Sequence, residues 1–153
     1  MDKNFLENYF DEFKELIKPD EENLTKLTLV KEKMIEVDSE GLKTLVFGNG
    51  GSASMASHFT VDLTKNAKIR AINFNEADLI TCFSNDYGFE NWISKAVDFY
   101  GDEGDILILI SSSGKSENML NAAKTAKENK FSSVITFSGF EKANPLSQLG
   151  DIN

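Results

Sequence analysis

The sequence has few cysteine, histidine and proline residues and no long apolar run. Its 153 residues include one cysteine, one histidine and two prolines. Cys82 has no partner for an internal disulfide, so we expect a small apolar side chain in a reducing cytoplasm. No apolar stretch reaches the roughly 18 residues of a membrane-spanning helix. The acidic N-terminus also lacks the hydrophobic core of a secretory signal. These absences favour a cytoplasmic protein with no membrane partner.

Positive charge is also scarce. The chain has 16 Lys and Arg residues against 25 Asp and Glu residues, which gives a formal net charge of -9. A protein that binds nucleic acid normally presents a basic face to the phosphate backbone, so nucleic acid is a poor candidate partner. A small anionic ligand remains compatible with this charge, because backbone N–H groups at helix ends bind anions without many cationic side chains.

The spacing of apolar residues predicts two helices, followed by strands that alternate with helices. Amphipathic helices are expected over 4–18 and 23–37, with Pro19 between them and Asp20 as the cap of the second. Strands are then expected at 43–49, 67–73, 105–111 and 132–139, and helices at 52–66, 86–100 and 116–130. Residues 79–83 fit a short strand or part of a helix, and 144–150 fit a short helix.

This alternation predicts an α/β fold: a doubly wound, mostly parallel sheet with helices on both faces and N-terminal helices before it. In such open sheets, ligands bind at the carboxyl ends of the strands. Two polar, glycine-containing clusters lie at those ends, "GNGGS" at 48–52 and "SSSGKS" at 111–116. We therefore expect the ligand site between these two clusters.

The glycine cluster is open to more than one interpretation. Gly48, Gly50 and Ala53 match the loose dinucleotide-binding pattern. That pattern also needs an acidic residue about 20 residues further on, and only the distant Glu76 is available. We therefore expect no nucleotide cofactor. A tight strand-to-helix turn without any ligand also fits the glycines.

The serine cluster contains "GKS" but is not a P-loop, because Leu109 occupies the position where that motif needs a glycine. A helix cap would account for one serine only. Lys115 adds a cation near the helix N-terminus, where free N–H groups favour an anion. The cluster therefore favours a phosphate site, with hydroxyls from Ser111, Ser112, Ser113 and Ser116.

His58 and Asp62 are four residues apart and share a face of the expected helix. A single histidine is more often packed or simply exposed, but beside a carboxylate it can orient a proton-transfer group or bind a metal. Two side chains do not complete a metal site, so further ligands would have to come from a carboxylate, an amide, a partner chain or another segment. Asn85 and Asp86 could hydrogen-bond sugar hydroxyls, although Asp86 could equally cap a helix.

Four ordered motifs together resemble the sugar isomerase (SIS) domain family, and within it the bacterial phosphoheptose isomerases. They are "GNGGSASMASHFTVDL", "SNDYGFE", "GDILILISSSGKSENMLNAA" and "SSVITFSG", over about residues 40 to 151. The resemblance implies a SIS domain over 41–153 behind a helical extension at 1–40. The domain would lack its C-terminal strand and helix, because the family's glutamine and histidine on that helix have no counterpart before Asn153.

The resemblance also implies a sugar-phosphate isomerase that works through an enediol, in a homotetramer with active sites between subunits. The four serines would hold the phosphate, while Asn49, Gly51, Ser52 and Asp86 would line the sugar pocket. His58 corresponds to a histidine near a metal site often filled by zinc. Asp62 takes the place of the family's glutamate base, and its carboxylate is about 1 Å shorter in reach, which disfavours positioned proton transfer. A non-catalytic SIS module, binding sugar phosphate or serving as an oligomeric adaptor, is the alternative.

Overall fold

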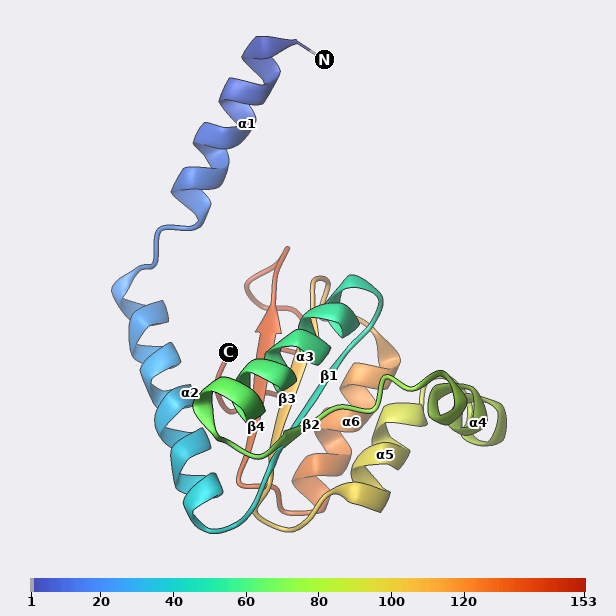
Figure 1. The fold of residues 1–153 in the computed structure, drawn as a ribbon. Coiled ribbons are helices and arrows are strands. Elements are labelled where there is room, and N and C mark those ends of the chain that lie inside the picture. The colour runs from blue at the N-terminus through green and yellow to red at the C-terminus, as the bar shows by residue number, and fades with distance from the viewer. Residues whose placement is uncertain (1) are drawn as a thin grey trace.

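The computed structural model describes residues 2–153 and contains one sheet of four parallel strands in the order β2-β1-β3-β4 (Figure 1). The central strands β1 and β3 run side by side and pair from Thr44 with Ile106 to Gly48 with Ile110. These two strands are buried along almost their whole length, as their apolar sequence predicts. The strand bounds are β1 Thr44–Gly48, β2 Ala71–Ile72, β3 Ile106–Ser111 and β4 Ser133–Ser138.

Helices cover both faces of the sheet, and alternate strand residues face each side. Leu45 and Phe47 of β1 pack in the cluster formed with α5 and α6, while Val46 packs in the cluster formed with α2 and α3. Figure 1 shows α2 and α3 on one side of the strands and α5 and α6 on the other. The helices are α1 Lys3–Leu16, α2 Glu21–Ser39, α3 Gly51–Asp62, the π-helical turn η1 Leu63–Ala67, α4 Ala77–Tyr87, α5 Trp92–Tyr100 and α6 Glu117–Glu128.

The α/β fold expected from the sequence is confirmed, and so is Asp20 as the cap of α2, because its side chain accepts a hydrogen bond from the Asn23 N–H at 2.7 Å. Several element bounds are corrected. The strand expected at 67–73 is only Ala71–Ile72. The helix expected to reach residue 66 ends at Asp62, and the π-helical turn η1 follows from Leu63. Residues 79–83 belong to helix α4.

Two further corrections have clear physical causes. The helix expected from residue 86 does not begin there: α4 ends at Tyr87, and Gly88 follows with a φ of 86°, a conformation that favours glycine at helix ends. Residues 144–150 form turns, because the Asn144 side chain accepts the Ser147 N–H at 2.9 Å and the Leu146 N–H donates to the Gly114 carbonyl at 3.0 Å.

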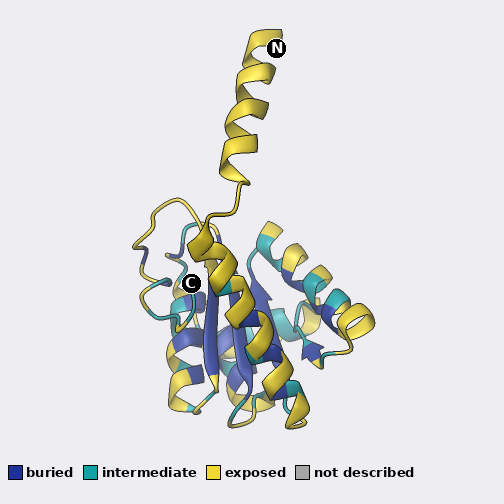
Figure 2. Ribbon diagram, turned by 90° about the vertical axis from the view of Figure 1, so that its left-hand side faces the viewer, coloured by how far each residue is buried: buried dark blue, intermediate teal, exposed yellow. Residues whose placement is uncertain are grey.

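Helix α1 extends away from the sheet and has no buried residue, whereas α2 contributes Val30, Met34 and Val37 to the core (Figures 1 and 2). The apolar residues of α1 and of the segment just after it are exposed: Phe5, Leu6, Tyr9, Phe10, Phe13, Leu16 and Ile17. The 1–40 boundary of the helical extension stays a prediction. No helix within residues 2–153 combines the length and the apolar character needed to span a membrane.

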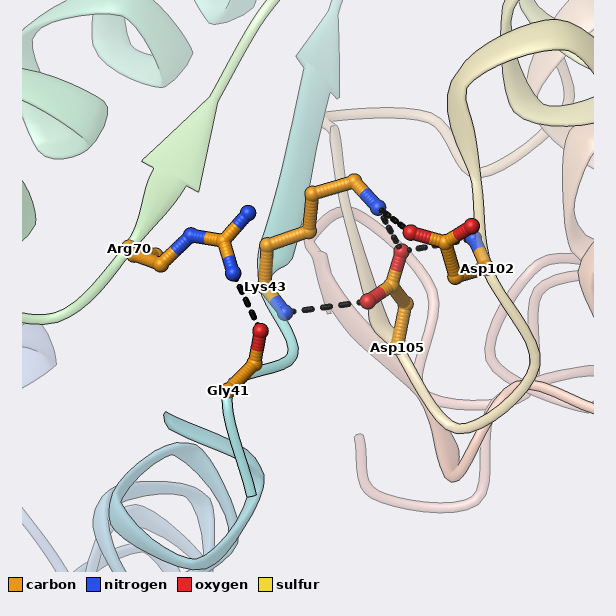
Figure 3. Close-up of polar contacts among 5 residues, drawn as sticks. All are labelled: Gly41, Lys43, Arg70, Asp102 and Asp105. Carbon is orange, nitrogen blue, oxygen red and sulfur yellow. Dashed lines mark hydrogen bonds and ion pairs between the residues drawn. The ribbon is translucent and has the colours of Figure 1, made fainter. Parts of the chain in front are cut away.

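An ion cluster joins the segments just before β1 and β3 (Figure 3). It therefore lies at the amino-terminal ends of these strands, whereas the two polar loops follow their carboxyl ends. The Lys43 ammonium lies 2.6 Å from a carboxylate oxygen of Asp102 and 2.6 Å from one of Asp105. Asp105 is fully buried and also accepts the backbone N–H groups of Lys43 and Asp102, at 2.9 and 2.8 Å. Burial alone would lower the pKa of Lys43, but the hydrogen bonds and charges of the two carboxylates raise it.

We expect Lys43→Met to lower the free energy of unfolding by about 3 kcal/mol at neutral pH, because it leaves the buried Asp105 carboxylate without its cation. The loss shrinks as the pH rises through the raised pKa of Lys43, above its ordinary value of 10.5, because the wild-type lysine then loses its own charge. Urea unfolding measures both effects. Lys14→Met is the control: Lys14 forms an exposed pair with Asp11, and an effect below about 0.5 kcal/mol is expected. Equal losses in both variants would contradict the role of the cluster.

Candidate functional site

The two polar loops expected to bind ligand lie next to each other. The glycine turn, residues 48–52, follows β1, and the serine loop, residues 111–116, follows β3. Because β1 and β3 are adjacent parallel strands, both loops emerge at the same edge of the sheet. Each loop leads into a helix, α3 or α6, so two helix N-termini with free N–H groups meet at this edge.

Glycine is required at the start of the glycine turn. A Cβ at Gly48 would lie 2.3 Å from the backbone carbonyl carbon and oxygen of Ser52. Gly50, the N-cap of α3, has a φ of 55°. The Ser52 and Ala53 N–H groups donate to the Asn49 and Gly50 carbonyls at 3.0 Å each, which closes the turn tightly. The glycines therefore bring the backbone of β1 close to the first turn of α3.

We expect Gly48→Ala to lower the free energy of unfolding by about 3 kcal/mol, because the clash is with backbone rather than with a flexible side chain. Gly51→Ala is the matched control, since a Cβ there meets nothing within 4 Å and the φ is not in the left-handed region. Thermal and urea unfolding of the two variants measure the difference. A Gly48→Ala protein as stable as Gly51→Ala would show that the turn relaxes freely.

The four serines of the serine loop differ in their surroundings. Ser111 is buried and its hydroxyl accepts the Gly114 N–H at 3.2 Å, so it shapes the loop. The Ser113 hydroxyl accepts the Lys115 N–H at 3.2 Å. Ser112 is exposed, Ser113 is partly exposed, and Ser116 is the N-cap of α6 without a side-chain capping bond. Three of the four side chains are thus exposed or partly exposed at this edge of the sheet.

Two other contacts fix the serine loop. Gly114 has a φ of 62°, and a Cβ there would lie 1.9 Å from the Asn144 amide oxygen. The Lys115 ammonium lies 2.9 Å from a carboxylate oxygen of Glu141. The cation expected at the phosphate site is therefore already paired with an exposed carboxylate.

A residue not anticipated from the sequence links the glycine turn to the first turn of α6. The side-chain amide of Asn49 donates to the Asn118 amide oxygen at 2.9 Å, and the Asn118 amide donates back to the Asn49 oxygen at 3.0 Å. Asn118 is 2% exposed. No sequence signal marks this pair, because Asn118 lies within α6 and 69 residues from Asn49.

His58 and Asp62 share a face of α3, as expected. The His58 Nε2 atom lies 3.5 Å from the Asp62 Oδ2 atom, with the side chains 81% and 49% exposed. The Asn66 side chain, in η1, donates to the other Asp62 oxygen at 2.9 Å. At 1.5 Å rise per residue, His58 and Asp62 lie about 10 and 16 Å along α3 from Gly51. The pair is therefore not gathered with the two loops within one chain.

Asn85 and Asp86 are not at a strand end, as their sugar-binding role assumed, and Asp86 does not begin a helix. Both lie in the last turn of α4, where they are exposed. The Asn85 amide donates to an Asp86 carboxylate oxygen at 2.8 Å. This position is a correction to the sequence-based expectation about their local structure.

The residues present do not fit a zinc ion by themselves. In the described part of the chain, no group of three or more His, Cys, Asp or Glu side chains is arranged to hold a metal. His58 and Asp62 supply two ligands, and a catalytic zinc site needs three protein ligands.

A cavity of about 500 Å³ adjoins the two loops on the α2 side of the sheet. Ser52, which ends the glycine turn, and Ser112 of the serine loop are among its lining residues. The rest of the wall is mainly apolar, with side chains that include Leu27, Val30, Met55, Ile110 and Ile135. Ile152, which forms a parallel bridge with Ile135 on the outer side of β4, also borders it.

The family model of the SIS domain matches residues 8–139, and the chain belongs to this family. Its curated relatives include phosphoheptose isomerases. This chain is 39% identical over 131 residues to the phosphoheptose isomerase of Fusobacterium nucleatum. The aligned region covers 81% of this chain and 68% of that protein. It is 36% identical to phosphoheptose isomerase 1 of Campylobacter jejuni, over 82% of this chain and 70% of that protein.

Solved structures agree with the sequence relatives. A phosphoheptose isomerase from Francisella tularensis superposes with a TM-score of 0.82 at 28% identity, over 97% of this chain and 80% of that chain. The phosphoheptose isomerase of Neisseria gonorrhoeae superposes with a TM-score of 0.76 at 33% identity, over 84% of this chain and 70% of that chain. The SIS fold and the resemblance to phosphoheptose isomerases expected from the motifs are confirmed.

Proposed function

We propose that the protein is an aldose–ketose isomerase that acts on sedoheptulose 7-phosphate or a similar sugar phosphate. The observation that carries this proposal is the meeting of the glycine turn and the serine loop at one edge of the sheet, in a chain whose relatives are phosphoheptose isomerases. A phosphate and a polyhydroxyl chain are the ligand groups that such paired loops suit.

In this proposal the serine loop holds the phosphate. The hydroxyls of Ser112, Ser113 and Ser116, with the N-terminus of α6, would donate to its oxygens, and Ser111 would keep the loop in shape. Sugar hydroxyls would contact the glycine turn through Asn49, Gly51 and Ser52. Asn85 and Asp86 would contribute to the sugar site from the last turn of α4, either in the same chain or in another copy.

Asp62 would be the base. It would take the proton from C1 of the ketose and return it to C2, while O2 gains and O1 loses a proton through the enediol. His58, 3.5 Å away, would be an electrostatic helper or a metal ligand. Zinc itself remains a prediction, because it would need ligands beyond this pair, and the steps above do not use it.

We also propose a homo-oligomer, a tetramer by the family resemblance, with sites completed between copies. Two observations support it: the exposure of His58 and Asp62, and the unpacked apolar side chains of α1.

We expect the wild-type chain to sediment above the mass of its 17.0 kDa monomer. The double variant Phe10→Glu with Phe13→Glu on α1 should sediment closer to the monomer mass. The control is Glu12→Gln, which changes a charged residue on the same helix without altering its apolar side chains. Equal sedimentation of wild type and the double variant would contradict this role of α1.

The function is tested by a coupled assay for aldose product from sedoheptulose 7-phosphate. Turnover above a no-enzyme control is expected. A non-catalytic sugar-phosphate-binding or adaptor module is the second candidate, favoured by the separation of the His58–Asp62 pair from the two loops within one chain. Binding of the sugar phosphate without turnover would select that candidate. The cytoplasmic location expected from the sequence stays a prediction.

A further inference from the structure

The reciprocal amide pair of Asn49 and Asn118 connects residues that are 69 positions apart in the sequence. Asn49 lies in the glycine turn between β1 and α3, and Asn118 is the second residue of α6. Each side chain donates one hydrogen bond and accepts one, at 2.9 and 3.0 Å. The pair thus joins the first turn of α6, which follows the serine loop, directly to the loop that follows the adjacent strand.

The two asparagine side chains differ in how far they are exposed. Asn118 is 2% exposed, so its amide is available to little besides Asn49. The Asn49 side chain is partly exposed and keeps one N–H and one acceptor position beyond the pair. The two reciprocal bonds form only when the oxygen of each amide faces the nitrogen of the other. Asn118 therefore fixes which groups of Asn49 face the ligand edge.

We propose that Asn118 is a positioning residue of the sugar-phosphate site, which it serves by holding Asn49 and the glycine turn against the start of α6. This inference rests on the proposed function for its ligand, and on the amide pair for its geometry. Asn118 itself contacts no sugar. Its effect is on the sugar end of the ligand, because the serine loop that would hold the phosphate keeps its own bonds through Ser111 and Ser113.

The test compares Asn118→Ala with the matched control Asn121→Ala, which removes an amide from the same helix that bonds instead to Glu90 and Asn91. Two probes are titrated by calorimetry and NMR: inorganic phosphate and sedoheptulose 7-phosphate. Asn118→Ala should weaken the binding of sedoheptulose 7-phosphate about 10-fold, as expected for a lost hydrogen-bonded pair. The affinity for inorganic phosphate should change by less than about twofold. The double variant Asn49→Ala with Asn118→Ala should bind sedoheptulose 7-phosphate no more weakly than Asn49→Ala alone, because the two residues act through one pair.

A second measurement does not depend on the proposed function. Amide hydrogen exchange of residues 48–53 should be faster in Asn118→Ala than in wild type and unchanged in Asn121→Ala. If the wild type binds no sugar phosphate, the proposed function fails, and this exchange result alone decides whether Asn118 positions the turn. Unchanged hydrogen exchange in the turn would overturn the inference. An equal loss of affinity for both probes would also overturn it, because Asn118 would then act on the serine loop.

Discussion

Replacing Asp62 with asparagine is expected to lower the turnover of sedoheptulose 7-phosphate by about 10²–10⁴-fold, the usual contribution of a general base. The amide has nearly the shape of the carboxylate but cannot take a proton. Asp62 is about half exposed and its bonds are to neighbours on the same helical stretch. Its replacement should therefore leave the fold stable, so that the loss reports on chemistry.

The measurement is kcat in the aldose-forming assay, with two comparison variants. Asp62→Glu keeps the carboxylate and extends its reach by about one methylene, so it should retain activity far better than the asparagine variant. Asp78→Asn removes another exposed acid, in the first turn of α4, and should leave kcat unchanged. Wild-type kcat in Asp62→Asn would remove Asp62 from the role of base.

The second large effect is expected from Ser113→Ala combined with Ser116→Ala, which should weaken sugar-phosphate binding about 100-fold. Two hydroxyls that donate to a phosphate dianion form charge-assisted hydrogen bonds, each worth more than a neutral bond. Both serines are partly exposed, Ser113 in the serine loop and Ser116 as the N-cap of α6, so the loss should not come with unfolding. Calorimetric titration with sedoheptulose 7-phosphate measures it.

The control is Ser39→Ala combined with Ser132→Ala, which removes two exposed hydroxyls outside the serine loop, at the end of α2 and just before β4. Affinity should stay at the wild-type value in this variant. The double variant of the loop should lose affinity for inorganic phosphate as well, because the serines meet the phosphate rather than the sugar. Unchanged affinity for both ligands would contradict the serine loop as the phosphate site.

The sequence predicted the edge of the sheet where the loops meet, because this follows from local patterns and a general rule. The apolar runs at β1 and β3 are unambiguous, and ligand loops of parallel sheets gather at the strands' carboxyl ends. His58 and Asp62 likewise share a face because they are four residues apart on α3. Their roles, like those of the serines, remain predictions.

What could not be predicted depends on contacts between distant residues or on weak local signals. Asn118 is a polar residue in a helix, and nothing near it in the sequence marks it as buried; its burial follows from Asn49 on the adjacent loop. The π-helical turn after Asp62 has a sequence that fits a continuing α-helix. Residues 79–83 form a short apolar run, which fits strand and helix alike.

If the proposed homo-oligomer forms through helix α1, the helix content of the protein would depend on its concentration. The 14 residues of α1 are close to the shortest length at which an isolated helix persists in water, and none of them is buried in the described part of the chain. Contacts from another molecule are then what would keep it helical. On dilution below the dissociation constant of the proposed assembly, helix content measured by circular dichroism should fall together with self-association, because folding of this segment and assembly would then be one equilibrium.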